Sequence, residues 1–200
     1  MKKTLEMKLL KLVLFLFLLP CITQAQIEIN PHIGLNTIPG DMVVEGAEFQ
    51  GEVGVTAGIF VRIVPENSLW FMPGIQYYTY KQGVLDTYGP STLDLGETSL
   101  KYVKIPLNLA YNLTGTGSPI KFFINGGFTP SFAISEPEDI VTDVLPNIRQ
   151  KDFLLGGNLG LGVDVLFGTL WLNYETSVTK IYEEADTPID LWTLALGVKF

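Results

Sequence analysis

The chain has 200 residues, a formal net charge of −8 at pH 7 and a single cysteine. The length suits a single domain, and the acidic balance argues against a nucleic-acid-binding protein, which needs basic side chains to contact phosphates. Twenty glycines, together with 12% aromatic residues and many β-branched ones, favour an all-β fold.

The first 25 residues have the organisation of a secretory signal peptide. Four lysines accompany a short apolar core from Leu12 to Leu19, and the segment ending at Ala25 provides the small residues that a signal peptidase requires. We predict cleavage after Ala25, so that residues 26–200 form the mature barrel domain. A lipoprotein signal retaining Cys21 is a weaker alternative, because Pro20 stands where a small flexible residue is expected. The apolar run is also too short for a membrane-spanning helix, which needs roughly 20 residues.

Cleavage after Ala25 changes the chemistry of the mature chain. It removes the only cysteine, and with it any disulfide or thiol chemistry. It also removes four of the 13 basic residues and one of the 21 acidic ones, which leaves 9 against 20 and a net charge of −11. The stability of the mature protein must then come from the barrel itself.

Apolar and polar residues alternate with a period of two in eight segments that turn signals separate. The predicted strands are Ile27–Asn36, Gly51–Val64, Leu69–Lys81, Glu97–Leu113, Pro119–Ser135, Lys151–Leu166, Thr169–Tyr182 and Ile189–Phe200. Tight connections at 65–67, 114–118 and 167–168 alternate with longer polar links, as periplasmic turns alternate with extracellular loops in outer-membrane barrels. The sequence therefore predicts an all-β fold, an eight-stranded antiparallel transmembrane up-and-down β-barrel with both termini in the periplasm.

The phase of the alternation distinguishes a membrane barrel from a soluble sandwich. In the second strand every odd-numbered position from Val53 to Ile63 is apolar, whereas Glu52, Thr56 and Arg62 lie in the opposite phase. The fourth and sixth strands keep their phase over similar lengths. Strands of soluble sandwiches seldom do so over ten or more residues, the length that a tilted strand needs to cross a bilayer. The pattern favours the outer membrane of a Gram-negative bacterium over a soluble secreted ligand-binding barrel.

The last predicted strand ends on an aromatic residue. In this strand, small or polar residues alternate with apolar ones. We predict that the apolar series is the C-terminal assembly signal, which the barrel assembly machinery recognises: Trp192, Leu194, Leu196, Val198 and Phe200. Outward aromatic residues form two further groups that are typical of the girdles at membrane interfaces. Tyr111, Phe122 and Phe200 are predicted near the periplasmic rim, and Tyr77, Phe132 and Trp192 nearer the outer rim.

Five short motifs carry a family resemblance: Gly34-Leu35-Asn36, Tyr102-Val103-Lys104-Ile105-Pro106, Asn125-Gly126-Gly127, Gly160-Leu161-Gly162 and Leu172-Asn173-Tyr174. In the order and spacing of these motifs, the whole mature chain resembles the PorT-like outer-membrane β-barrel family of Bacteroidota. The resemblance implies an eight-stranded barrel of mostly unassigned role, whose founding member is linked to secretion of surface proteins through the type IX system. It implies no catalytic residue.

Eight strands enclose an interior only wide enough for side chains, which argues against a general diffusion pore. Buried charges must be paired, so we predict a structural network of the charged residues that share the lumen phase: Arg62, Lys104, Lys121, Lys199, Glu28, Glu52, Asp164 and Glu175. A gated polar path, or a proton or ion relay, is the alternative. Phe60, Trp70, Phe123 and Trp171 are also in the lumen phase. They are predicted to plug the barrel unless a β-bulge returns one or two of them to the lipid interface.

Residues for catalysis and cofactor binding are scarce. His32 is the only histidine, and the strand phase predicts that it lies inside the barrel without a serine or carboxylate partner. The phosphate loop, the paired-cysteine metal site and the dinucleotide fingerprint are absent from the sequence. We therefore predict no enzymatic activity, no cofactor and no metal, with an outer-membrane hydrolase as an outside alternative.

The predicted long loops are acidic, and most of this charge is ordinary solvated surface. An alternative role for part of this charge is a divalent-cation site that bridges to lipopolysaccharide phosphates, formed by Glu136, Glu138 and Asp139. The spacing of these three residues matches no defined calcium loop. We expect a monomeric barrel, surrounded by outer-membrane lipids and lipopolysaccharide, that acts as a structural or interaction surface through its extracellular loops. The remaining alternatives are an accessory of protein secretion, with secretion-system or surface proteins as partners, and a narrow small-solute channel.

Overall fold

The computed structural model describes residues 26–39, 41–44, 47–64, 68–86, 93–114, 118–135, 151–179 and 190–200. These ranges contain eleven strands: β1 (Gln26–Thr37), β2 (Asp41–Val44), β3 (Ala47–Gly51), β4 (Val53–Val64), β5 (Leu69–Asp86), β6 (Leu93–Lys104), β7 (Leu107–Asn112), β8 (Ile120–Ala133), β9 (Phe153–Val165), β10 (Gly168–Ser177) and β11 (Asp190–Val198). Within these ranges no helix is long and apolar enough to cross a membrane. The predicted signal peptide and the acidic group at 136–139 lie outside the described residues.

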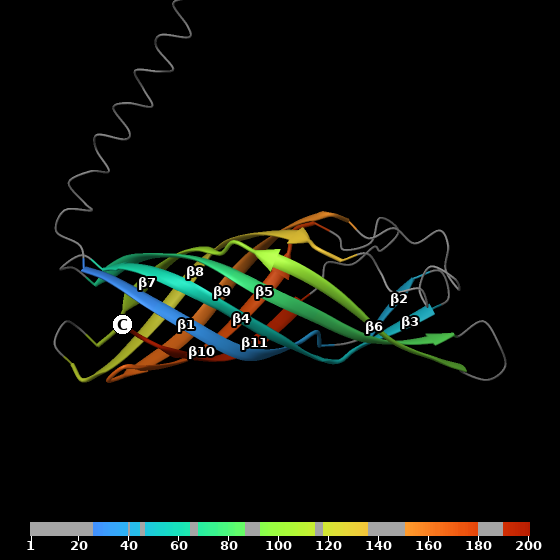
Figure 1. Ribbon diagram of the computed structural model, residues 1–200, viewed down its shortest axis with the longest axis horizontal. Helices are drawn as coiled ribbons and strands as arrows, with labels where there is room; N and C mark the ends of the chain where they lie inside the picture. The colour runs from blue at the N-terminus through green and yellow to red at the C-terminus, as the bar shows by residue number, and fades with distance from the viewer. Residues whose placement is uncertain are drawn as a thin grey trace, which may run out of the picture.

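The strands form one antiparallel sheet that closes on itself (Figure 1). β1 pairs with both β11 and β4, and the circuit continues from β4 through β5 to β6 and β7, then through β8, β9 and β10 back to β11. β6 and β7 are two parts of one barrel strand, interrupted at Ile105-Pro106 because proline cannot donate to the ladder. The barrel therefore has eight strand positions, as the sequence predicts.

The register of the strands fixes their stagger. The pairing can be followed from Thr37 on β1 around the barrel, one residue per strand, through Trp192, Tyr174, Leu159, Gly126, Leu109, Phe71 and Ile63. It returns to β1 at Ile27, ten residues before Thr37. A stagger of this kind requires the strands to tilt against the barrel axis, and together with the strand number it sets the width of the interior. The interior has room for side chains alone.

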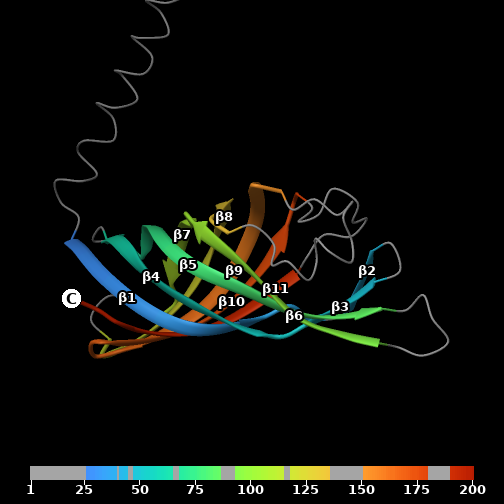
Figure 2. The ribbon, with the colours of Figure 1, turned by 45° about the vertical axis from the view of Figure 1, so that its right-hand side comes forward.

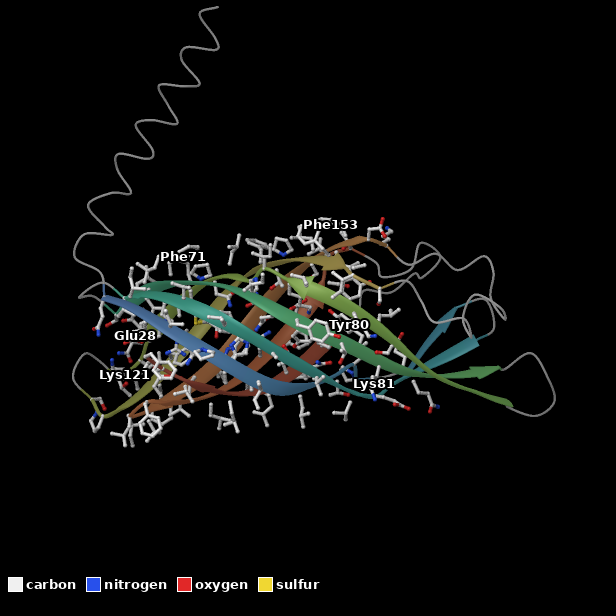
Figure 3. All side chains as sticks on the ribbon, viewed as in Figure 1. Glu28, Phe71, Tyr80, Lys81, Lys121 and Phe153 are labelled. Atoms are coloured by element: carbon white, nitrogen blue, oxygen red, sulfur yellow. The ribbon has the colours of Figure 1, made fainter. Side chains whose placement is uncertain are left out.

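Side-chain exposure follows the predicted phase. Outward positions are apolar and exposed, as at Val53 (58%) and Leu159 (63%), whereas inward positions such as Phe60 (2%) are buried. Figure 3 shows Phe71 and Phe153 pointing away from the wall of the barrel. The alternation in the second, fourth and sixth predicted strands is confirmed, and it gives the barrel an apolar outer surface of the kind that faces lipid.

The two ends of the barrel differ. One end, here called the terminal end, carries Gln26, Phe200 and the tight turn at Leu166-Phe167. At the other end, here called the hairpin end, β5 and β6 continue beyond the wall, and β2 and β3 pair alongside them (Figures 1 and 2). The sequence predicts a loop over 37–50 and an earlier end of the third strand at Lys81. The structure differs because the extended edge of β5 offers unpaired backbone groups to β3.

Candidate functional site

Asp164 is the centre of a buried ion cluster near the terminal end of the lumen. Its Oδ2 accepts hydrogen bonds from Arg62 Nη1 at 2.7 Å and from Lys199 Nζ at 3.2 Å. Its Oδ1 accepts a third from Thr169 Oγ1 at 2.7 Å. One carboxylate from β9 therefore holds cations from β4 and from the end of the chain after β11, and these contacts join three parts of the wall.

The guanidinium of Arg62 also contacts aromatic rings. Its Cζ lies 5.0 Å from the centre of the Phe123 ring and 6.0 Å from that of Trp70. The side chain is 1% exposed, so cation–π attraction acts here without competition from bulk water. Arg62 thus links the ion cluster to the aromatic rings of Phe123 and Trp70.

The middle of the lumen is filled by the aromatic plug, a packed group formed by His32, Phe60, Trp70, Phe123 and Trp171. His32 stacks on Phe60 at 4.7 Å between ring centres, and Phe60 meets Trp171 edge-on at 5.1 Å. Trp70 packs against Phe123 at 5.5 Å. All four predicted lumen aromatics point inward, which confirms the plug and excludes a bulge that would return one to lipid.

Glycines make room for the aromatic plug. A Cβ at Gly162 would overlap the ring of Phe123, and one at Gly74 would lie 2.6 Å from Cδ1 of Phe60. The void between the plug and its neighbours has a volume of about 10 Å³ and is lined by Asn30, Met72 and Ala195 among others. This is about the space of one water molecule, so the lumen has no continuous opening at this level.

The hydrogen bonds of His32 are those of an interior residue. Its Nδ1 donates to the carbonyl of Asn30 at 3.3 Å, and its Nε2 accepts from the amide of Gln76 at 2.8 Å. Neither partner is a nucleophile or a carboxylate, and the arrangement that a hydrolytic triad needs is not formed. The predicted interior position of His32 is confirmed.

A second ion pair lies between the plug and the hairpin end. Lys104 Nζ on β6 donates to Glu175 Oε1 on β10 at 2.8 Å, and Lys104 is fully buried. The same ammonium lies 4.0 Å from the ring centre of Tyr78 and 5.0 Å from that of Tyr80. Sequence reasoning missed the two tyrosines, although their even-numbered positions on β5 put them in the same inward phase as Trp70.

The eight charged residues predicted to form one network are distributed differently. Five of them form two groups separated by the aromatic plug, the Asp164 cluster and the Lys104–Glu175 pair. In the described part of the chain, Glu28, Glu52 and Lys121 join no ion pair. Glu28 and Lys121 lie at the terminal end, opposite Arg62 and Asp164 in the register (Figure 3). Plug side chains occupy the space between the two groups, so a single network cannot form.

The rims and the last strand lie where the sequence places them. Tyr111, Phe122 and Phe200 are exposed toward the terminal end, and Tyr77, Phe132 and Trp192 are exposed toward the other. β11 closes the barrel between β10 and β1, and backbone hydrogen bonds in both directions join Phe200 to Ile29. Among the described residues, no three His, Cys, Asp or Glu side chains are grouped in a way that could hold a metal ion.

An eight-stranded wall that is apolar outside and filled by charged, polar and aromatic side chains inside defines a small transmembrane β-barrel. Residues 24–183 match the family described as the outer membrane protein beta-barrel domain, and the chain belongs to that family.

Two solved structures share the fold. OprG from Pseudomonas aeruginosa is 13% identical, with a TM-score of 0.53 over 88% of this chain and 97% of that one. Neisserial surface protein A is 16% identical, with a TM-score of 0.52 over 88% of this chain and 99% of that one. At these identities the likeness concerns the fold alone. A search of curated proteins gives no match to this sequence.

Proposed function

We propose that this protein is an integral barrel of the Gram-negative outer membrane that works without catalysis, as a rigid scaffold for the surface at its hairpin end. The observation that supports this role is the filled lumen, where the aromatic plug leaves a void of about 10 Å³. A barrel closed in this way does not serve as a general pore. Its useful surface then lies outside the wall, in the connections and strands beyond it.

The hairpin end offers such a surface. β2, β3 and the extensions of β5 and β6 are hydrogen-bonded side by side in the order β2-β3-β5-β6. In the proposed orientation the terminal end faces the periplasm, and this small sheet stands outside the cell. A sheet continuous with the barrel wall is held in place by the wall, which suits a surface for interaction or assembly.

The proposal includes the route to the membrane. Residues 1–25 act as a signal peptide cleaved after Ala25, and the last strand, with Trp192, Leu194, Leu196, Val198 and Phe200, acts as the assembly signal for the barrel machinery. Lipids and lipopolysaccharide surround the folded monomer, whose lumen charges serve a structural role.

Electrical recording in planar bilayers tests the scaffold role against a channel. We expect the folded wild-type protein to give no steady single-channel conductance, because the plug closes the lumen. Trp171→Ala removes one plug side chain and should give intermittent openings, whereas Trp192→Ala, on the outer face, should not. Steady conductance from the wild-type protein would overturn the proposal and support a small-solute channel. Slower gel migration after boiling verifies that each sample contains a folded barrel.

An accessory role in protein secretion is the second candidate, supported by the resemblance to the PorT-like family of Bacteroidota. The motifs that carry the resemblance occupy structural positions in this barrel. Gly162 accommodates Phe123, and Ile105-Pro106 separates β6 from β7. Deleting the gene and measuring surface proteins in the culture medium and on cells tests this role. Normal surface display in the deletion strain would exclude it.

A further inference from the structure

The outer wall contains an apolar groove that the scaffold role does not use. The groove has a volume of about 540 Å³ and crosses the outward faces of β4, β1 and β11. Ala57 provides a small side chain within it, between larger apolar neighbours that include Ile33, Leu35, Leu194 and Tyr77. Its shape and apolar lining suit a hydrocarbon chain.

The groove runs across the wall from Leu170, near the start of β10, toward the hairpin end. Ile33 and Leu35 belong to the second half of β1, which starts at the terminal end. Tyr77 lies where β5 approaches the rim, and tyrosine is typical of the interface between hydrocarbon and headgroups. In the proposed orientation, the part of the groove at Leu35 and Tyr77 therefore lies in the outer leaflet.

Two lysines stand on the outer face just beyond Tyr77. Lys81 follows Tyr77 by two outward positions on β5, and Lys101 on β6 pairs with Thr79 between them. Figure 3 shows Lys81 where the wall gives way to the extension of β5 and β6. Neither lysine pairs with a carboxylate of the described residues. The carboxylate of Glu52 also lies in this region, beside Gly83 on β5.

The distribution of positive charge is selective. Among the described residues of the mature chain, Arg62, Lys104 and Lys199 are held in lumen ion pairs. Lys121 lies at the terminal end. Lys81 on β5, Lys101 on β6 and Lys151, two positions before β9, all lie at the hairpin end. In a mature chain with a net charge of −11, this position is suited to an anionic headgroup.

We propose that the groove and the two lysines form one binding site for a phosphorylated glycolipid of the outer leaflet. An acyl chain lies in the groove beside Ala57, and a phosphate contacts Lys81 and Lys101. A phosphomonoester carries about −1.5 to −2 charges near neutral pH and accepts short, charge-assisted hydrogen bonds from ammonium groups. The site goes beyond the scaffold role and gives the barrel a preferred lipid partner.

Native mass spectrometry of the folded, detergent-solubilised protein tests the headgroup contact. The probes are bisphosphorylated lipid A and the same lipid after removal of both phosphates. Lys81→Gln with Lys101→Gln should weaken binding of bisphosphorylated lipid A about 25-fold, or about five-fold for each lysine near the membrane surface. Lys121→Gln, at the opposite end, is the matched control and should leave it unchanged. Equal binding by the double variant and the wild type, or equal wild-type affinity for both lipids, would overturn the proposal.

A second pair of variants tests the groove. Ala57→Phe fills it and should weaken binding of bisphosphorylated lipid A about ten-fold, whereas Val163→Phe on the outward face of β9 should not. Inorganic phosphate should not compete at concentrations comparable to that of the lipid, because it has no acyl chain. Unchanged affinity in Ala57→Phe, or effective competition by inorganic phosphate, would contradict the site. These results are independent of the conductance that tests the scaffold role.

Discussion

The two halves of the lumen hold buried charge in different ways. Toward the terminal end, Asp164 serves two cations at once, Arg62 and Lys199. Toward the hairpin end, Glu175 forms an ion pair with one cation, Lys104, which also faces two tyrosine rings. Aromatic rings lie beside the cation in both arrangements, but one carboxylate neutralises two cations in the first and one cation in the second.

Their surroundings differ as well. The terminal half borders the aromatic plug, whose rings fit against glycines such as Gly162. At the level of the plug and beyond it, the lumen is rich in asparagines with side-chain atoms that have no protein partner: Asn36, Asn108, Asn125, Asn158 and Asn173. Close packing of rings therefore fills the middle of the lumen. Polar atoms without a protein partner, which favour hydration, occur on both sides of the plug, because Arg62 Nε and Trp70 Nε1 also have none.

The largest loss of stability is expected at Asp164, because two buried cations depend on this one carboxylate. Asp164→Asn keeps the shape of the side chain but leaves Arg62 and Lys199 buried with no negative charge. Removing one partner of a buried pair costs about 3–5 kcal/mol. Urea unfolding in lipid vesicles measures the loss. Asp152→Asn, at the exposed position just before β9 and at the opposite end of the barrel, is the control and should unfold like the wild type.

The close packing of the aromatic plug predicts the next effect. Gly162→Ala places a methyl group against the ring of Phe123 and should reduce the free energy of unfolding by about 2–3 kcal/mol through overpacking. Gly157→Ala on the same strand meets no atom within 4 Å and should be neutral or slightly stabilising. The same unfolding assay compares the two. Equal free energies of unfolding for the two variants would show that the plug tolerates extra volume.

The smallest effect is expected at the hairpin-end pair. Glu175→Gln leaves one buried cation, Lys104, without a counter-charge, whereas Asp164→Asn leaves two. The Glu175 side chain is also 10% exposed, against 2% for Asp164. The free energy of unfolding should therefore fall by about 1–2 kcal/mol, clearly less than for Asp164→Asn. If the two substitutions cost the same, the proposed difference between the halves is wrong.

Strand phase made much of this barrel predictable. Because side chains alternate strictly across a strand, Arg62, Lys104 and Asp164 could be assigned to the lumen from sequence position alone. The same rule predicted the inward position of His32 and of the four plug aromatics. It could not show that Tyr78 and Tyr80 would flank Lys104, since that contact depends on the register between the neighbouring strands β5 and β6.

The sequence by itself determined the eight strand positions, their order, and which side chains face inward, because these depend on period-two alternation and local turn residues. Only the tertiary structure decided which inward residues meet. Partners such as Arg62 and Asp164 are 102 positions apart, and their contact depends on the stagger of ten residues that closes the wall. That stagger also separates the charges into two groups and places the plug between them. A property of the whole closed sheet is not encoded in any one strand.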